Sequence, residues 1–138
     1  MPTPDPVAEI EALLYEYAFR LDAGDLDGVA GLFAAATWRS GRRALRGRDE
    51  VRTAYDPVRL YGDGRPGTQH VITNARVAIA PDGRTATSRC YFTVLQAARI
   101  ILAGRYHDEL ARSQDLGWHF TDRLILADLR GDLSGHYQ

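Results

Sequence analysis

The stretch Gly67-Thr-Gln-His-Val-Ile-Thr-Asn-Ala-Arg-Val-Ala-Ile79 has the length and the alternation of a long β-strand. At a period of two, one face carries five residues that we expect to pack in the core: Val71, Thr73, Ala75, Val77 and Ile79. The opposite face carries His70, Ile72, Asn74 and Arg76, a mixture of polar and apolar groups that is typical of a ligand pocket. His70 is therefore either a hydrogen-bonded structural residue or a catalytic one.

The composition is that of an ordinary globular domain. A chain of 138 residues fits one domain with a substantial core, so we expect a single domain over residues 1–138. Charged residues make up 25% of the chain and hydrophobic residues 45%, with a net charge of −1. The arginines are spread along the sequence and form no basic stripe, which argues against nucleic acid as a partner.

The sequence also indicates the cellular setting. Cys90 is the one cysteine, so no disulfide can form within the chain and a reducing compartment is expected. Residues 1–6 contain three prolines and should form an extended tail, with neither the basic start nor the apolar run of a signal peptide. No segment reaches the length of a membrane span. We therefore expect a cytoplasmic protein that does not contact membranes.

Helical patterns fill most of the N-terminal half. Apolar residues recur at helical spacing from Ile10 to Leu21, and Gly24 is placed to end that helix. Asp25 can cap a second helix that continues to Phe33. A short strand is predicted over residues 36–40, followed by an arginine-rich turn over 41–47 and a third helix that Pro57 ends.

Strand patterns fill the C-terminal half. Glycines in the loop 61–67 lead into the strand quoted above, and Pro81-Asp-Gly83 marks the turn that follows it. Further strands are predicted over residues 85–96, 99–112 and 118–128. Helices followed by an antiparallel meander indicate an α+β domain with its helices on one side of a curved sheet.

Several kinds of chemistry lack the residues that they require. The four histidines, at positions 70, 107, 119 and 136, show no metal-ligand spacing. The sequence has no nucleophile elbow, phosphate loop or dinucleotide fingerprint. All 17 basic residues are arginine, so a lysine Schiff base is excluded. Acid–base catalysis with neither metal nor cofactor is the expectation that remains.

The order of these elements and five short motifs resemble a known superfamily. The motifs are Tyr17 with Asp22, Gln69-His-Val-Ile-Thr-Asn74, Gly104-Arg-Tyr-His-Asp108, Trp118 with Arg123, and Gly131-Asp-Leu-Ser134. Together they resemble the nuclear-transport-factor-2-like superfamily, and within it the SnoaL-like polyketide cyclase, scytalone dehydratase and bile-acid dehydratase group. The resemblance implies a cone-shaped, mainly antiparallel sheet with three N-terminal helices. It also implies that Asp22 and His70 meet inside the cone beside tyrosines.

The resemblance assigns provisional roles to individual residues. Asp22 and His70 would form an acid–base pair, and Tyr17 would either donate to a substrate carbonyl or serve as a core aromatic residue. Strand alternation lets either Tyr106 or His107 face the cone, and we favour Tyr106. Arg123 would bind an anionic substrate group or, as the alternative, form an ion pair. The remaining substrate-binding candidates are Tyr55, Asn74 and Trp38.

We therefore expect a cofactor-independent lyase or isomerase, with dehydration of a small, mostly apolar cyclic substrate as the first choice. The alternative is a non-catalytic ligand-binding protein or partner subunit of the same fold. An open cone with Asp22 and His70 in hydrogen-bond reach favours the enzyme, whereas a cone filled by side chains favours the alternative. A homodimer or homotrimer is also expected, because Val94, Ile100 and Leu102 exceed what one core face can absorb.

Overall fold

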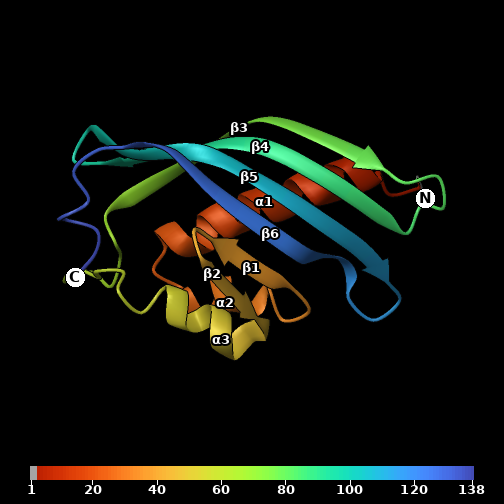
Figure 1. Ribbon diagram of the computed structural model, residues 1–138, viewed down its shortest axis with the longest axis horizontal. Coiled ribbons are helices and arrows are strands. Elements are labelled where there is room, and N and C mark those ends of the chain that lie inside the picture. Colours follow the sequence, from red (N-terminus) through yellow and green to blue (C-terminus); the bar gives the residue numbers. More distant parts are fainter. Residues whose placement is uncertain (1–2) are drawn as a thin grey trace.

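A six-stranded, strongly curved sheet dominates the computed structural model, which describes residues 3–138 (Figure 1). Neighbouring strands are antiparallel except for the parallel pair β1 and β6. Across the sheet the strands follow the order β2 (Arg43–Arg46), β1 (Thr37–Ser40), β6 (Gly117–Arg130), β5 (Arg99–Ser113), β4 (Thr85–Gln96) and β3 (Thr68–Ile79). The sheet is not closed into a barrel, because β2 and β3 each have one unpaired edge.

Three helices lie on the concave side of the sheet: α1 (Pro6–Asp22), α2 (Leu26–Gly31) and α3 (Gly47–Ala54) (Figure 1). The side chain of Asp5 caps α1, and a proline at its first position suits a helix start. Residues 1 and 2 of the expected tail lie outside the described residues. None of the described helices is long and apolar enough to cross a membrane. The α+β cone expected from the sequence is confirmed.

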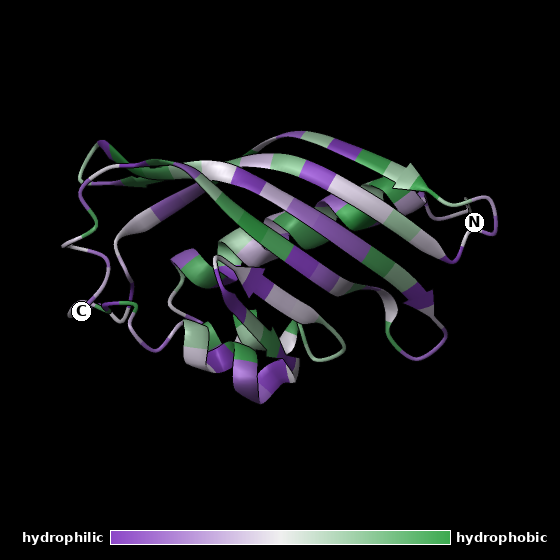
Figure 2. Ribbon diagram, in the orientation of Figure 1, coloured by the Kyte–Doolittle hydropathy of each residue, from purple (hydrophilic) through white to green (hydrophobic). Residues whose placement is uncertain are grey.

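The core lies between α1 and the concave face of the sheet. Helix α1 contributes Ile10, Leu14 and Tyr17, while alternate residues of β4 are buried. Hydrophobic and hydrophilic residues also mix along the strands in the ribbon coloured by hydropathy (Figure 2). Val94 belongs to the buried set of β4 and is 2% exposed, so the expectation that it adds to an outer apolar face is wrong. Ile100 is 59% exposed, as that expectation requires.

The strand β3 contains a bulge that the alternation rule did not predict. The register against β4 shifts between Thr73 and Arg76, and Asn74 has a left-handed φ of 56°. The bulge exchanges the two faces of the strand, so that Ile72 before it and Ala75 after it both pack on the core. The single core face that we expected from residue 71 to residue 79 is therefore wrong.

The segment that we expected to be a turn includes the short strand β2. Its four residues pair with β1 in antiparallel register, with Trp38 opposite Leu45. The sequence Arg43-Ala-Leu-Arg46 is polar and lies at the sheet edge, where a strand needs little apolar alternation. The hairpin places β1 beside β6 and brings Trp38 to the interior.

Candidate active site

A cavity of about 310 Å³ opens between α1, the C-terminal end of α3 and the concave face of the sheet. This volume suits a small organic molecule. Strands β1, β3, β4, β5 and β6 and the C-terminal segment also contribute side chains to its wall. Its aromatic and polar lining includes Tyr17, Trp38, Tyr55, His70, Tyr106 and His136. The cone is therefore not filled by its own side chains.

His70 lines this cavity and is bound to Asp22, which lies in a neighbouring pocket that His70 also lines. Nδ1 of His70 lies 2.6 Å from Oδ1 of Asp22, and the backbone N–H of His70 donates to Oδ2 at 2.7 Å. The hydroxyl of Thr68 donates to Oδ1 at 2.9 Å. The side chain of His70 is only 5% exposed, so its ring is held in one place by its partners.

The electrostatics of Asp22 decide which nitrogen of His70 carries the proton. Burial acts to raise the pKa of Asp22, but the hydrogen bonds from His70 and Thr68 outweigh it and lower that pKa below its usual value. The carboxylate is thus ionised and can only accept hydrogen bonds, so we assign the neutral imidazole proton to Nδ1. Nε2 keeps its lone pair and is the nitrogen left to act as a base on a ligand in the cavity.

A glycine at the end of α1 allows this arrangement. Gly24 has a left-handed φ of 79°, and a Cβ there would lie 2.1 Å from the carbonyl oxygen of Gly64. The loop 61–67 can therefore pass directly against the helix end before β3 begins. As a result, the first residues of β3, including Thr68 and His70, lie beside Asp22.

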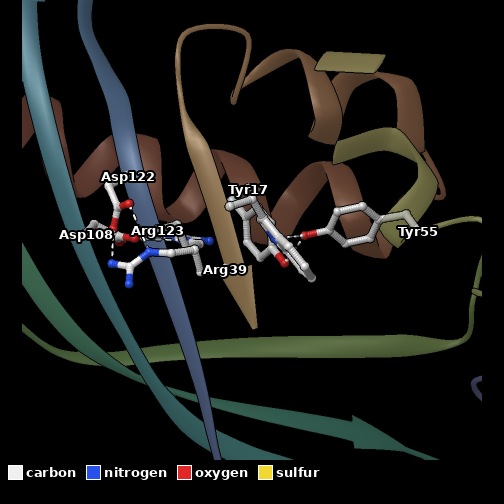
Figure 3. Close-up of polar contacts among 7 residues, drawn as sticks. Tyr17, Arg39, Tyr55, Asp108, Asp122 and Arg123 are labelled. Atoms are coloured by element: carbon white, nitrogen blue, oxygen red, sulfur yellow. Dashed lines mark hydrogen bonds and ion pairs between the residues drawn. The ribbon is translucent and has the colours of Figure 1, made fainter. Parts of the chain in front are cut away.

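Two tyrosines form a second polar group in the cavity. The hydroxyls of Tyr17 and Tyr55 lie 2.8 Å apart and point toward one another (Figure 3). Nε1 of Trp38 donates to the hydroxyl of Tyr55 at 3.1 Å. The ring of Tyr17 stands perpendicular to that of His70, with a centroid distance of 6.4 Å. Burial raises the pKa of both tyrosines, so each keeps its proton and can donate it.

Comparison with known proteins identifies the family. Residues 5–123 match the family model of the SnoaL-like domain. The chain belongs to the SnoaL-like domain family. No curated protein matches the sequence at a significant level.

Solved structures share the fold of this SnoaL-like domain. A variant of Rv3472 from Mycobacterium tuberculosis, a protein of unknown function, is 27% identical with a TM-score of 0.73, covering 88% of this chain and 76% of that one. ActVI-ORFA from Streptomyces coelicolor is 21% identical with a TM-score of 0.69, over 90% and 98% of the two chains. An NTF2-like protein with a cystatin-like fold from Novosphingobium aromaticivorans is 22% identical with a TM-score of 0.72, over 94% and 85%.

The structure places five of the expected pocket residues on the cavity of the SnoaL-like domain and excludes Asn74. The five are Tyr17, Trp38, Tyr55, His70 and Tyr106. Asn74 lies exposed on the convex face of the sheet, where it lines a separate groove with Arg76 and His107. Asn74 does not line the cavity because it forms the left-handed step of the β3 bulge, a conformation that asparagine tolerates.

Arg123 also departs from its assigned role. Its side chain is fully buried and makes two hydrogen bonds to Asp108, of 2.7 and 2.9 Å, so the ion-pair alternative holds (Figure 3). The guanidinium carbon lies 4.4 Å from the ring centroid of Tyr17 and 4.0 Å from that of Tyr106. Arg123 thus supports the rings of the cavity wall from behind and does not line the cavity.

Sequence reasoning missed the contribution of the C-terminal segment, residues 131–138. His136 lines the cavity and is only 3% exposed, although it follows a glycine-rich stretch with no periodic pattern. No signal in the local sequence points to it.

Among residues 3–138, no three histidine, cysteine, aspartate or glutamate side chains lie close enough to bind a metal ion.

The buried imidazole should make the stability of the SnoaL-like domain pH-dependent. Burial, helped by nearby His70, lowers the pKa of His136 from 6.5 to about 4. Between these values the unfolded chain binds one more proton than the folded one, so the free energy of unfolding falls as the pH drops from 6.5 to 4. We expect a loss of up to about 3 kcal/mol, measured by urea unfolding at pH 7 and pH 4.5. His136→Phe should abolish this part of the loss, and an unchanged loss in that variant would contradict the assignment.

Proposed function

We propose that this SnoaL-like domain is a cofactor-independent acid–base enzyme, a lyase or isomerase, whose first reaction to test is the dehydration of a small cyclic hydroxy-ketone. The observation that carries the proposal is the hydrogen bond of 2.6 Å between His70 and Asp22 at the wall of an open cavity. A half-buried, ionised carboxylate on Nδ1 orients the imidazole and leaves Nε2 free to act as a base.

In the first step, His70 acts as the base. The substrate carbonyl accepts a hydrogen bond from Tyr17, and Nε2 of His70 takes a proton from the carbon next to the carbonyl. The electron pair of that C–H bond moves onto the carbonyl oxygen as an enolate, while Asp22 stabilises the new imidazolium. A donor that is already in place is most effective at this point, because the negative charge develops there.

The tyrosine pair and Trp38 form one hydrogen-bond chain that can serve this step. Trp38 can only donate, so the hydroxyl of Tyr55 accepts from it at 3.1 Å. When Tyr55 donates in turn to Tyr17, the proton of Tyr17 is free for the substrate. Donors linked in this way strengthen one another.

In the second step, the enolate collapses and the bond between the β-carbon and the hydroxyl oxygen breaks. The imidazolium of His70 returns its proton to the leaving oxygen, so that water departs and His70 is neutral again. One substrate molecule yields one unsaturated ketone and one water, with no change in oxidation state. Protonating the enolate at another carbon instead would give an isomerisation.

The proposal is tested with a substrate that reports its own dehydration. Loss of water from 3-hydroxy-1-tetralone gives 1-naphthol after tautomerisation, and the product is detected by its fluorescence. Catalysed formation of 1-naphthol above the buffer rate supports the proposal. Its absence with this ketone and with a panel of monocyclic and bicyclic β-hydroxy-ketones would favour the non-catalytic alternative.

Tyr17→Phe should lower kcat/KM for this reaction by about tenfold, less than the loss of a sole oxyanion donor, because Tyr55 lies close enough to donate instead. The double variant Tyr17→Phe, Tyr55→Phe should lose more than the product of the single effects. Tyr15→Phe, on the exposed side of the same helix, is the matched control. Equal rates for the double variant and the wild type would remove the tyrosines from the mechanism.

We further propose that the protein acts in the cytoplasm as a homodimer or homotrimer, on a small-molecule substrate. Three large apolar side chains of the sheet are exposed to solvent: Tyr91 (54%), Ile100 (59%) and Leu129 (67%). Such side chains favour an interface. Light scattering at micromolar concentration should give a mass above that of one chain, and a strict monomer would contradict the assembly.

A further inference from the structure

His136 is a polar residue of the cavity wall that the acid–base mechanism does not use. It lines the same cavity as His70 and Tyr17 but reaches it from the C-terminal segment. Its Nδ1 atom is fully buried and has no hydrogen-bond partner among the described residues. Buried polar atoms in proteins are nearly always paired. The ring of His136 has no protein partner for Nδ1 and lines the cavity, so a ligand there can supply a hydrogen bond that the protein does not.

The position of His136 is fixed by the backbone around it. Its carbonyl oxygen accepts a hydrogen bond of 2.8 Å from the N–H of Arg59, and its N–H donates to Leu133 at 3.0 Å. The next residue, Tyr137, pairs with Val58 as an isolated β-bridge. Backbone hydrogen bonds thus hold the chain on both sides of His136. The missing partner of Nδ1 is therefore not explained by a poorly held C-terminus.

The charge state of His136 defines what it can bind. Burial, together with nearby His70, lowers its pKa to about 4, so the ring is neutral at physiological pH. A neutral imidazole has one donor and one acceptor nitrogen. A hydroxyl group matches either nitrogen, since it can both donate and accept. An anionic group would find no positive charge on this ring.

We propose that His136 binds a hydroxyl group of the ligand through its imidazole, which makes it a specificity-determining residue for cyclic ketones that carry a hydroxyl. This inference rests on the proposed function only in taking the ligand to be a small cyclic ketone. The carbonyl is held at Tyr17 and the hydroxyl at the C-terminal wall. An apolar ketone of the same size lacks the second contact.

A purely structural role predicts different behaviour. If His136 only filled space, phenylalanine would fill it equally well, and no ligand would distinguish the two residues. Under our proposal, His136→Phe leaves the melting temperature of the ligand-free protein unchanged or raises it, since an unpaired buried nitrogen is removed. The same change abolishes the preference for hydroxylated ligands.

The test is a binding titration followed by tryptophan fluorescence, because Trp38, one of the two tryptophans, lies in the cavity wall. The probes are 1-tetralone and its 5-, 6- and 7-hydroxy derivatives, none of which can lose water. In the wild type, at least one hydroxylated probe should bind about tenfold more tightly than 1-tetralone. His136→Phe should bring that ratio close to one, and His136→Asn should restore part of it, because the asparagine amide can also hydrogen-bond a hydroxyl.

Further outcomes separate this proposal from the catalytic one. His119→Phe, a change at a histidine that lies outside the cavity, should leave the ratio unchanged. If no hydroxylated probe binds more tightly than 1-tetralone, or if the ratio persists in His136→Phe, the inference is wrong. A preference that depends on His136 in a protein without dehydratase activity would instead sustain the inference and overturn the proposed reaction.

Discussion

Replacing His70 by alanine should lower kcat/KM for the dehydration of 3-hydroxy-1-tetralone by about 10² to 10⁴, the usual contribution of a positioned acid–base group. The imidazole both removes the proton and returns it to the leaving oxygen, so no step of the reaction avoids it. Asp22→Asn should cost somewhat less. The amide cannot stabilise an imidazolium, but the general base is still present.

Two controls make this result interpretable. Circular dichroism and the melting temperature establish that each variant is folded, which matters because Asp22 also holds the backbone of β3 at His70. His119→Ala changes a histidine outside the cavity and should retain full activity. A folded His70→Ala variant with wild-type kcat/KM would exclude the dyad from the chemistry.

The second large effect concerns the buried ion pair behind the cavity. Arg123→Met leaves the carboxylate of Asp108 buried without its partner, which should reduce the free energy of unfolding by about 3–5 kcal/mol. Both side chains are 0% exposed, so water cannot compensate for the loss. The rings of Tyr17 and Tyr106 would also lose the cation that they pack against. Urea unfolding at pH 7 measures the change.

The chain offers a matched exposed pair as a control. Arg105 makes a similar two-bonded contact with Asp128, but both side chains are more than 40% exposed. Arg105→Met should therefore change the free energy of unfolding far less than Arg123→Met. The double variant Arg123→Met, Asp108→Leu should recover most of the lost stability. Equal effects of the two arginine substitutions would refute the role given to burial.

The fold could be predicted because its signals are local and repeated. The helical stripe of α1, the glycine at position 24 and the alternation along β4 each follow from short-range geometry. The strand β2 escaped prediction because an edge strand of four polar residues lacks such alternation. The β3 bulge escaped because a single left-handed residue, Asn74, reverses the face assignment of everything beyond it.

The site was only partly predictable. Asp22 and His70 were paired by family resemblance, since residues 48 positions apart carry no local signal of contact. The partner of Arg123 depended on strand register, because Asp108 faces it across β5 and β6. The position of His136 in the cavity wall depends on how the non-repetitive C-terminal segment folds back against residues 57–59. Such long-range contacts are set by packing and not by periodicity.

The central claim is that His70, oriented by Asp22, removes a proton next to a carbonyl that is bound in the cone. Hydrogen–deuterium exchange at C2 of 1-tetralone in D₂O, followed by NMR, isolates this step, because 1-tetralone has no hydroxyl to lose. We predict that the wild type accelerates exchange above the buffer rate and that folded His70→Ala does not. Exchange at the same rate with both proteins would contradict the account.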